Sequence, residues 1–184
     1  MVLLRDETAF DATAGSELLS RAFGDDIGPK PSDTVRAGRM PAEGLALVAE
    51  AEDGRLAGCV RLWHVAAGGV PALLLGPLAV DPAFQGAGVG SMLMRRALNR
   101  AGAAGHRAVV LVGDPAYYGR FGFSSALTER LVLREDVLRH RFLGLELIPG
   151  ALAAASGRVV GTGAVAPDAV PTGTITVDER LLTA

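Results

Sequence analysis

A glycine-rich turn between an apolar segment and a helix-like segment constrains this chain more than any other feature. Residues 80–91 read Val-Asp-Pro-Ala-Phe-Gln-Gly-Ala-Gly-Val-Gly-Ser and join a strand-like run at 73–80 to a helical pattern at 89–100. Glycines at alternate positions let a ligand approach the main chain closely. The first N–H groups of a helix lack intrahelical acceptors and carry the positive end of its dipole. The segment predicts a site for a phosphate or diphosphate, although a tight turn without a ligand fits the same residues.

The spacing of these glycines distinguishes the turn from two other phosphate-binding loops. A P-loop needs Lys and then Ser or Thr after its last glycine, but Ser91 follows Gly90. A dinucleotide fingerprint needs a third glycine where this chain has Ser91 or Leu93. These mismatches argue against a nucleotide-dependent enzyme. The pattern that is present is Gln85-x-x-Gly88-x-Gly90.

The composition indicates one globular domain. Of 184 residues, 49% are apolar and 21% are charged, which is enough to build a sizeable core. The net charge of −2, without a basic tract, argues against a nucleic-acid partner. No apolar run reaches a membrane-spanning length, and Asp6 and Glu7 stand where a secretory signal would be basic and then apolar. We therefore expect a cytoplasmic protein with no membrane partner.

The remaining reactive side chains suggest no metal or disulfide. Cys59 is the single cysteine and lies in an apolar strand pattern, which is typical of a small core residue. His64, His106 and His140 are scattered without metal-ligand spacing, so we expect no metal site.

The hydrophobic periodicity predicts an alternation of strands and helices. A helix at 10–23 ends at Gly24, and Asp53-Gly54 marks a hairpin. Strands are expected at 2–5, 45–50, 56–65, 72–80, 108–112, 131–134 and 142–148. The strand at 72–80, the helix at 89–100 and the buried strand at 108–112 form a βαβ unit, with the ligand at the carboxyl end of the strand.

Two segments of this pattern are irregular. Gly76-Pro77 interrupts a strand, and because proline cannot donate to a ladder the pair marks either a bulge or the end of the strand. Beyond Pro149 the composition shifts to Ala, Gly, Thr and Pro, which predicts a loosely packed tail with a weak edge strand at 174–177.

Taken together, the motifs resemble those of the GNAT superfamily of N-acetyltransferases. Gln85-x-x-Gly88-x-Gly90 resembles the signature whose loop wraps the pyrophosphate of acetyl-coenzyme A. The runs Leu-Gly-Pro-Leu-Ala-Val-Asp-Pro at 75–82 and Gly-Asp-Pro-Ala-Tyr-Tyr at 113–118 are similar to those of one branch of the family. The resemblance implies an α/β GNAT fold, with a mixed central sheet flanked by helices, at 1–150. It leaves 151–184 as a C-terminal tail on that domain.

The resemblance also implies which residues form the site. Acetyl-CoA is the expected cosubstrate, and a bulge in the strand at 72–80 is expected to bind its pantetheine arm. Tyr118, four residues before Gly122-Phe123, is the expected general acid, although an aromatic side chain packing over the loop fits the same position. The chain departs from the family where Gly113 follows Val112, because many members have an Asn near this strand end. The expected cofactor-binding residues are Leu78, Ala79, Val80, Gln85, Gly86, Ala87, Gly88, Val89, Gly90 and Ser91.

The implied reaction is attack of a neutral amine on the acetyl thioester. A phenol with a pKa of about 10 is protonated at neutral pH, as a general acid must be. No general base stands out among Glu43, Glu50, His64, Asp81 and Asp114, and Asp114 before Pro115 is typical of the N-cap of a short helix. Tyr117 is expected in the core or pocket wall, and Arg120 fits either a solvated helix face or a contact with a cofactor phosphate. Asp25-Asp26 fits either a solvated turn or a site for a cationic amine.

The partner that the resemblance implies is a small-molecule or peptide amine, and we expect a monomer or homodimer. A non-catalytic acyl-CoA-binding regulatory module is the alternative, since it would share the glycine loop without needing an acid at Tyr118.

Overall fold

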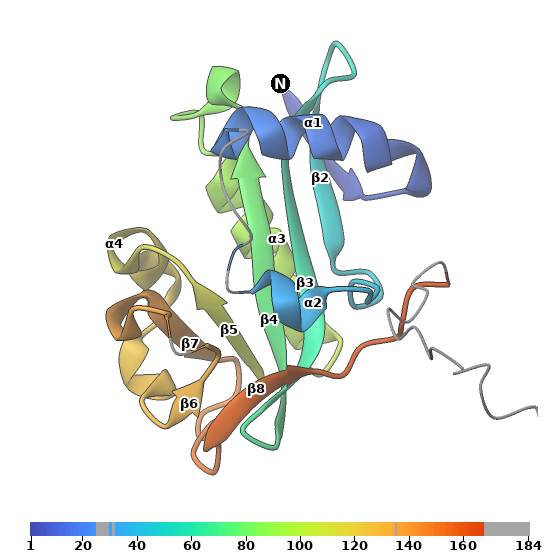
Figure 1. The fold of residues 1–184 in the computed structure, drawn as a ribbon. Helices are drawn as coiled ribbons and strands as arrows, with labels where there is room; N and C mark the ends of the chain where they lie inside the picture. The colour runs from blue at the N-terminus through green and yellow to red at the C-terminus, as the bar shows by residue number, and fades with distance from the viewer. Residues whose placement is uncertain (25–29, 31, 135, 168–184) are drawn as a thin grey trace, which may run out of the picture.

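The computed structural model is built on a mixed β-sheet with helices on both faces (Figure 1). The structure describes residues 1–24, 30, 32–134 and 136–167. The strands found there are β1 (Val2–Asp6), β2 (Ala46–Ala51), β3 (Leu56–Ala67), β4 (Val70–Val80), β5 (Ala108–Val112), β6 (Leu131–Val132), β7 (Phe142–Glu146) and β8 (Gly157–Gly161). The α-helices are α1 (Ala12–Phe23), α2 (Asp33–Arg36), α3 (Val89–Ala103) and α4 (Pro115–Tyr118). The 3₁₀ helices are η1 (Ala9–Asp11), η2 (Pro82–Phe84), η3 (Gly119–Phe121), η4 (Ser125–Thr128) and η5 (Arg139–Arg141).

The strand order is β1-β2-β3-β4-β5-β7, and one pair in this row is parallel. β4 and β5 run parallel because α3 connects them, whereas the other neighbours in the row are antiparallel. This arrangement confirms the predicted mixed sheet and the predicted strand–helix–strand unit.

Two apolar layers hold the helices to the sheet. α3 packs Leu93 and Met94, both fully buried, on the face of the sheet that includes Leu47. α1 packs Leu18 on the other face against Val48 and Cys59. The alternation of Leu47 and Val48 between the two faces is the period of two that a strand dictates. Each buried leucine stabilises the fold by roughly 1.5–3 kcal/mol.

A bulge interrupts β4 at Gly76-Pro77. Val60 pairs with Leu78 and Leu62 pairs with Leu75, so the single residue between them on β3 faces both Gly76 and Pro77. The indole Nε1 of Trp63 donates a hydrogen bond of 2.5 Å to the carbonyl oxygen of Gly76. The bulge, and not a strand end, is therefore the correct interpretation of this pair.

β4 and β5 separate just beyond their short parallel ladder. The paired residues are Leu73 with Val109 and Leu74 with Val110, close to the level of the bulge. Figure 1 shows that β5 runs toward α4 beyond this point and so moves away from β4. The sheet therefore opens at the carboxyl ends of both strands, where the βαβ unit is expected to bind its ligand.

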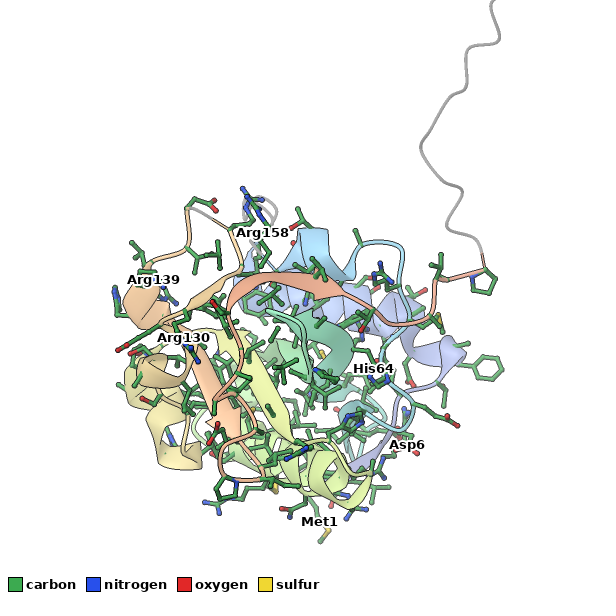
Figure 2. All side chains as sticks on the ribbon, turned by 90° about the horizontal axis from the view of Figure 1, so that it is seen from below. Met1, Asp6, His64, Arg130, Arg139 and Arg158 are labelled. Carbon is green, nitrogen blue, oxygen red and sulfur yellow. The ribbon has the colours of Figure 1, made fainter. Side chains whose placement is uncertain are left out.

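Residues 151–161 differ from the loosely packed tail that the sequence predicts. β8 pairs with β3 and with β6 and crosses the lower end of the sheet in Figure 1; its residue Arg158 is labelled in Figure 2. Leu152 is 3% exposed, Ala155 2% and Val159 4%. The prediction fails because β8 has only five residues, too few to show a clear hydrophobic alternation, and it is defined by its pairing with β3 and β6. The weak strand predicted at 174–177 lies outside the described residues.

No helix in the described part of the chain has the length and apolar character needed to cross a membrane.

Candidate active site

A cavity of about 860 Å³ lies where β4 and β5 separate. Its walls come from the bulged half of β4, the glycine loop, α4 and η3, α2 and the segment around 136–141. Tyr118 therefore shares one cavity with most of the glycine loop, although the two motifs are far apart in sequence.

The glycine loop leaves the start of α3 uncapped. Gly88 is the N-cap with φ 81° and ψ 3°, and as a glycine it gives the first turn of the helix no side-chain cap. Because this φ is in the left-handed region, a side chain at position 88 would strain the backbone. The uncapped turn has the geometry and dipole that favour an anion.

Eight of the ten predicted cofactor-binding residues line the cavity, and two do not. Ala79 is 2% exposed and packs against α1 on the opposite face, as the alternation along β4 requires. Ala87 lies in the loop but does not line the cavity, and its N–H donates to the carbonyl of Phe84 at 3.4 Å. The lining residues are Leu78, Val80, Gln85, Gly86, Gly88, Val89, Gly90 and Ser91.

Asp81 fixes the loop from outside the cavity. It is 7% exposed, accepts a hydrogen bond of 2.9 Å from the N–H of Ala83, and accepts one of 2.8 Å from Nε of Arg21 on α1. These two donors hold the pKa of the Asp81 carboxyl below its ordinary value. Asp81 therefore links α1 to the loop through its carboxylate, and its position and lowered pKa suit this structural role.

Tyr118 sits on α4 at the cavity wall, directly over Gly113. A Cβ placed on Gly113 would lie 2.1 Å from Cε2 of the Tyr118 ring, so any other residue at 113 would push the ring away. Burial first, and then the neighbouring Tyr117, raise the pKa of Tyr118 to about 12, while the charge of Arg141 acts in the opposite direction. Tyr118 is therefore protonated at neutral pH. The contact with Gly113 also gives a steric reason for the departure from the family pattern at this strand end.

α4 begins as predicted, with a carboxylate cap. Asp114 accepts a hydrogen bond of 3.0 Å from the N–H of Ala116, which confirms it as the N-cap. Of the five side chains considered as a base, Asp114 alone lines the cavity. Glu50, for example, is 2.5 Å from Nε of Arg5 at the far side of the sheet.

Two further cavity residues, for each of which the sequence leaves two places open, lie beside the start of α3. The Tyr117 hydroxyl would lie 2.7 Å from a Cβ on Gly90, so it stands over the first turn of the helix. Arg120 lines the cavity instead of a purely solvated face, with its guanidinium 4.4 Å from the centroid of the Tyr117 ring. Their i, i+3 spacing was the available signal, since such residues share one helix face.

The cavity wall also includes polar residues that no motif marked. They are Lys30, Ser32, Arg36, Asp136 and Arg141. The predicted acidic pair Asp25-Asp26 lies outside the described residues. Within residues 1–24, 30, 32–134 and 136–167, no three His, Cys, Asp or Glu side chains gather as metal ligands.

Comparisons with known proteins bear on the family and the fold of the chain. Residues 42–125 match the acetyltransferase (GNAT) domain family. The chain is 33% identical over 160 residues to the uncharacterized N-acetyltransferase YhbS of Escherichia coli strain K12, covering 86% of this chain and 95% of YhbS. The structure of E. coli YhbS in complex with CoA has a TM-score of 0.75 and 32% identity, covering 88% of this chain and 89% of that one. A GNAT family acetyltransferase from Brucella melitensis in complex with acetyl-CoA has a TM-score of 0.62 and 32% identity, covering 81% of this chain and 90% of that one. The chain belongs to the GNAT family of N-acetyltransferases, which confirms both the predicted family and the predicted fold.

Proposed function

We propose that this protein transfers the acetyl group of acetyl-CoA to a primary amine by direct attack, with Tyr118 as the general acid. One observation supports this most strongly: the uncapped start of α3 and the Tyr118 ring face the same cavity. An anion site and a protonated phenol in one cavity are the parts that a phosphorylated thioester carrier requires.

The cavity fits acetyl-CoA in both size and chemistry. Its volume of about 860 Å³ is in the range of small-molecule sites. The loop from Gln85 to Ser91 would hold the diphosphate through main-chain N–H groups, and Arg120 beside it supplies a positive charge. The main chain at 78–80, after the bulge, would hold the pantetheine arm and thioester. Two relatives have structures with CoA or acetyl-CoA.

The bulge has a catalytic role in this proposal. When bound, acetyl-CoA supplies an activated acetyl group on a thioester sulfur. Main-chain N–H groups of β4 near Leu78 would polarise the carbonyl as the amine attacks, because a fixed donor stabilises charge that develops on the oxygen. The new C–N bond forms, the C–S bond breaks, and the amine loses a proton while the sulfur gains one.

The hydroxyl of Tyr118 would donate to the thioester sulfur as the C–S bond breaks. A proton moving from a phenol with a pKa of about 12 to a thiolate with a reference pKa of about 8.5 goes uphill by roughly 5 kcal/mol. The phenol therefore acts first as a hydrogen-bond donor to the departing sulfur. The charge of Arg141 already lowers the Tyr118 pKa, so proton transfer would be still more uphill without it. We assign Arg141 to this supporting role.

The test is a pair of measurements on Tyr118→Phe and wild type. Isothermal titration with CoA should give the same Kd for both proteins, because the hydroxyl is not needed for the diphosphate. Free-thiol release from acetyl-CoA with a panel of primary amines should slow by about 10²-fold or more in the variant. Unchanged turnover would remove Tyr118 from this role. CoA binding without thiol release from any amine would favour the non-catalytic acyl-CoA-binding module.

A further inference from the structure

The cavity extends past the bulge to a group of cationic side chains on and around α2. α2 lies in front of β4 at mid-strand, away from the loop that follows the end of β4 (Figure 1). Lys30, Arg36 and Arg141 line this part of the cavity. The carboxylate on the same wall, Asp136, is already engaged, because it accepts hydrogen bonds of 2.9 and 3.1 Å from Arg134. The described wall here therefore has an excess of positive charge.

Arg36 is the cation nearest the bulge. Its Nη1 would lie 3.6 Å from a Cβ on Gly76, and its guanidinium is 6.0 Å from the centroid of the Trp63 ring. Its Nη2 donates to Asp33, one turn earlier on α2. The side chain is 15% exposed. The guanidinium is therefore held in place beside Gly76, with Nη2 engaged by Asp33 and Nη1 nearest to the bulge.

The charges around Arg36 are not balanced by Asp33. That carboxylate also accepts a hydrogen bond of 2.8 Å from the main-chain N–H of Lys30. The Lys30 ammonium is 3.0 Å from the centroid of the Phe23 ring, and burial first and then the charge of Arg36 lower the Lys30 pKa. Among the residues that the structure describes here, two cations therefore share the Asp33 carboxylate in a partly desolvated place. An added anion would be favoured there, since charge-assisted bonds to Arg are strong when both groups are shielded from water.

We infer that Arg36 binds a carboxylate of the acetyl acceptor, so that the acceptor is a small amine carrying a carboxylate close to its reactive nitrogen, such as an amino acid. The inference rests on the proposed function, which places the thioester at 78–80 and the cofactor phosphates at the glycine loop. Gly76 is two residues from Leu78, about 7 Å along a strand. A carboxylate held at Gly76 is thus a few bonds from a nitrogen that attacks the thioester. A polycationic amine would instead be repelled by the positive charges of Lys30, Arg36 and Arg141.

Trp63 gives a direct readout of this subsite. It is the single tryptophan of the chain, its ring lies beside the Arg36 guanidinium, and it bonds to Gly76. The protein saturated with CoA would be titrated with each of the twenty amino acids and with the matching amino-acid amides, and Trp63 fluorescence followed. We expect a saturable change with at least one amino acid, none with its amide at the same concentration, and loss of the change in Arg36→Gln. Arg95→Gln, an exposed arginine of α3 outside the cavity, should keep the wild-type response.

The rate of thiol release from acetyl-CoA tests the same inference on the acetyl-transfer reaction itself. For a responding amino acid, wild type should have a kcat/KM at least 10-fold above that for its amide, with the difference mainly in KM, and Arg36→Gln should bring this ratio close to one. Arg36→Lys should restore only part of it, because lysine lacks the planar fork. Equal kcat/KM for acid and amide, a ratio unchanged in Arg36→Gln, or no fluorescence response to any amino acid overturns the inference. Absence of CoA binding in calorimetry would instead refute the proposed function itself.

Discussion

Gly113→Ala provides a sharp test of how the fold positions Tyr118. The added Cβ would lie 2.1 Å from Cε2 of the Tyr118 ring, whereas ordinary carbon contacts are about 3.5 Å or more. The ring must therefore move by more than 1 Å, and a displacement of about 1 Å at a reacting group can cost about 10²-fold in rate. Gly113 has no left-handed φ, so the backbone tolerates alanine and the effect is steric.

The assay is steady-state thiol release, with CoA affinity measured in parallel. We expect Gly113→Ala to lower kcat by about 10²-fold with little change in the Kd for CoA. The double variant with Tyr118→Phe should be no slower than Tyr118→Phe alone, because both changes remove the same interaction. Gly119→Ala, on the same segment with nothing within 4 Å of the added Cβ, is the matched control. Full activity in Gly113→Ala, or additive losses in the double variant, would refute the reasoning.

Three further predictions concern acid–base behaviour and stability. The pKa of Tyr118, about 12, predicts that kcat shows no loss of activity from Tyr118 ionisation below about pH 11. A fall in kcat near pH 9 that disappears in Tyr118→Phe would contradict this prediction. Asp81→Ala removes the cap on Ala83 and the bond from Arg21, so urea titration should show a loss of about 1–3 kcal/mol in the free energy of unfolding. Because the folded-state pKa of Asp81 is lowered, this difference should be constant above about pH 5 and should shrink as the pH falls below about 4; a constant difference down to pH 2 would contradict the cause. Leu152→Ala should cost about 2–5 kcal/mol, since Leu152 is 3% exposed, and a loss under 1 kcal/mol would mean that residues 151–161 contribute little to the core.

The fold was largely predictable because its signals are local. Strand alternation, the Asp53-Gly54 hairpin and the glycine at the start of α3 each act within a few residues, and all appear where the sequence places them. β8 could not be predicted in this way, because its five residues are defined by their pairing with β3 and β6. The bulge is an intermediate case: the residues Gly76-Pro77 indicate an irregularity, but the pairing with β3 decides its type.

The site was predictable where main-chain geometry sets the chemistry. The loop and Tyr118 lie at one cavity, as the two motifs suggest, because β4 and β5 separate beyond their short ladder and the cavity lies between their carboxyl ends. Arg36 and Arg141 were missed because they come from α2 and from the segment after β6, and nothing in their local sequence indicates that the fold brings them to the same wall. Tyr117 was expected in the core or pocket wall, and its place over Gly90 is seen only when α4 packs beside the start of α3.

The central claim is that the first turn of α3 grips a diphosphate in the cavity that also holds Tyr118. Calorimetry with CoA and with pantetheine, which has the thiol arm but no diphosphate, tests it most directly. Each charge-assisted bond contributes about 1.5–3 kcal/mol, so two of them predict that CoA binds at least about 100-fold more tightly than pantetheine. Gly88→Val, which forces a branched side chain onto a φ of 81°, should reduce that advantage to less than 10-fold. Equal affinities for CoA and pantetheine in the wild type, or an undiminished advantage in Gly88→Val, would contradict the account.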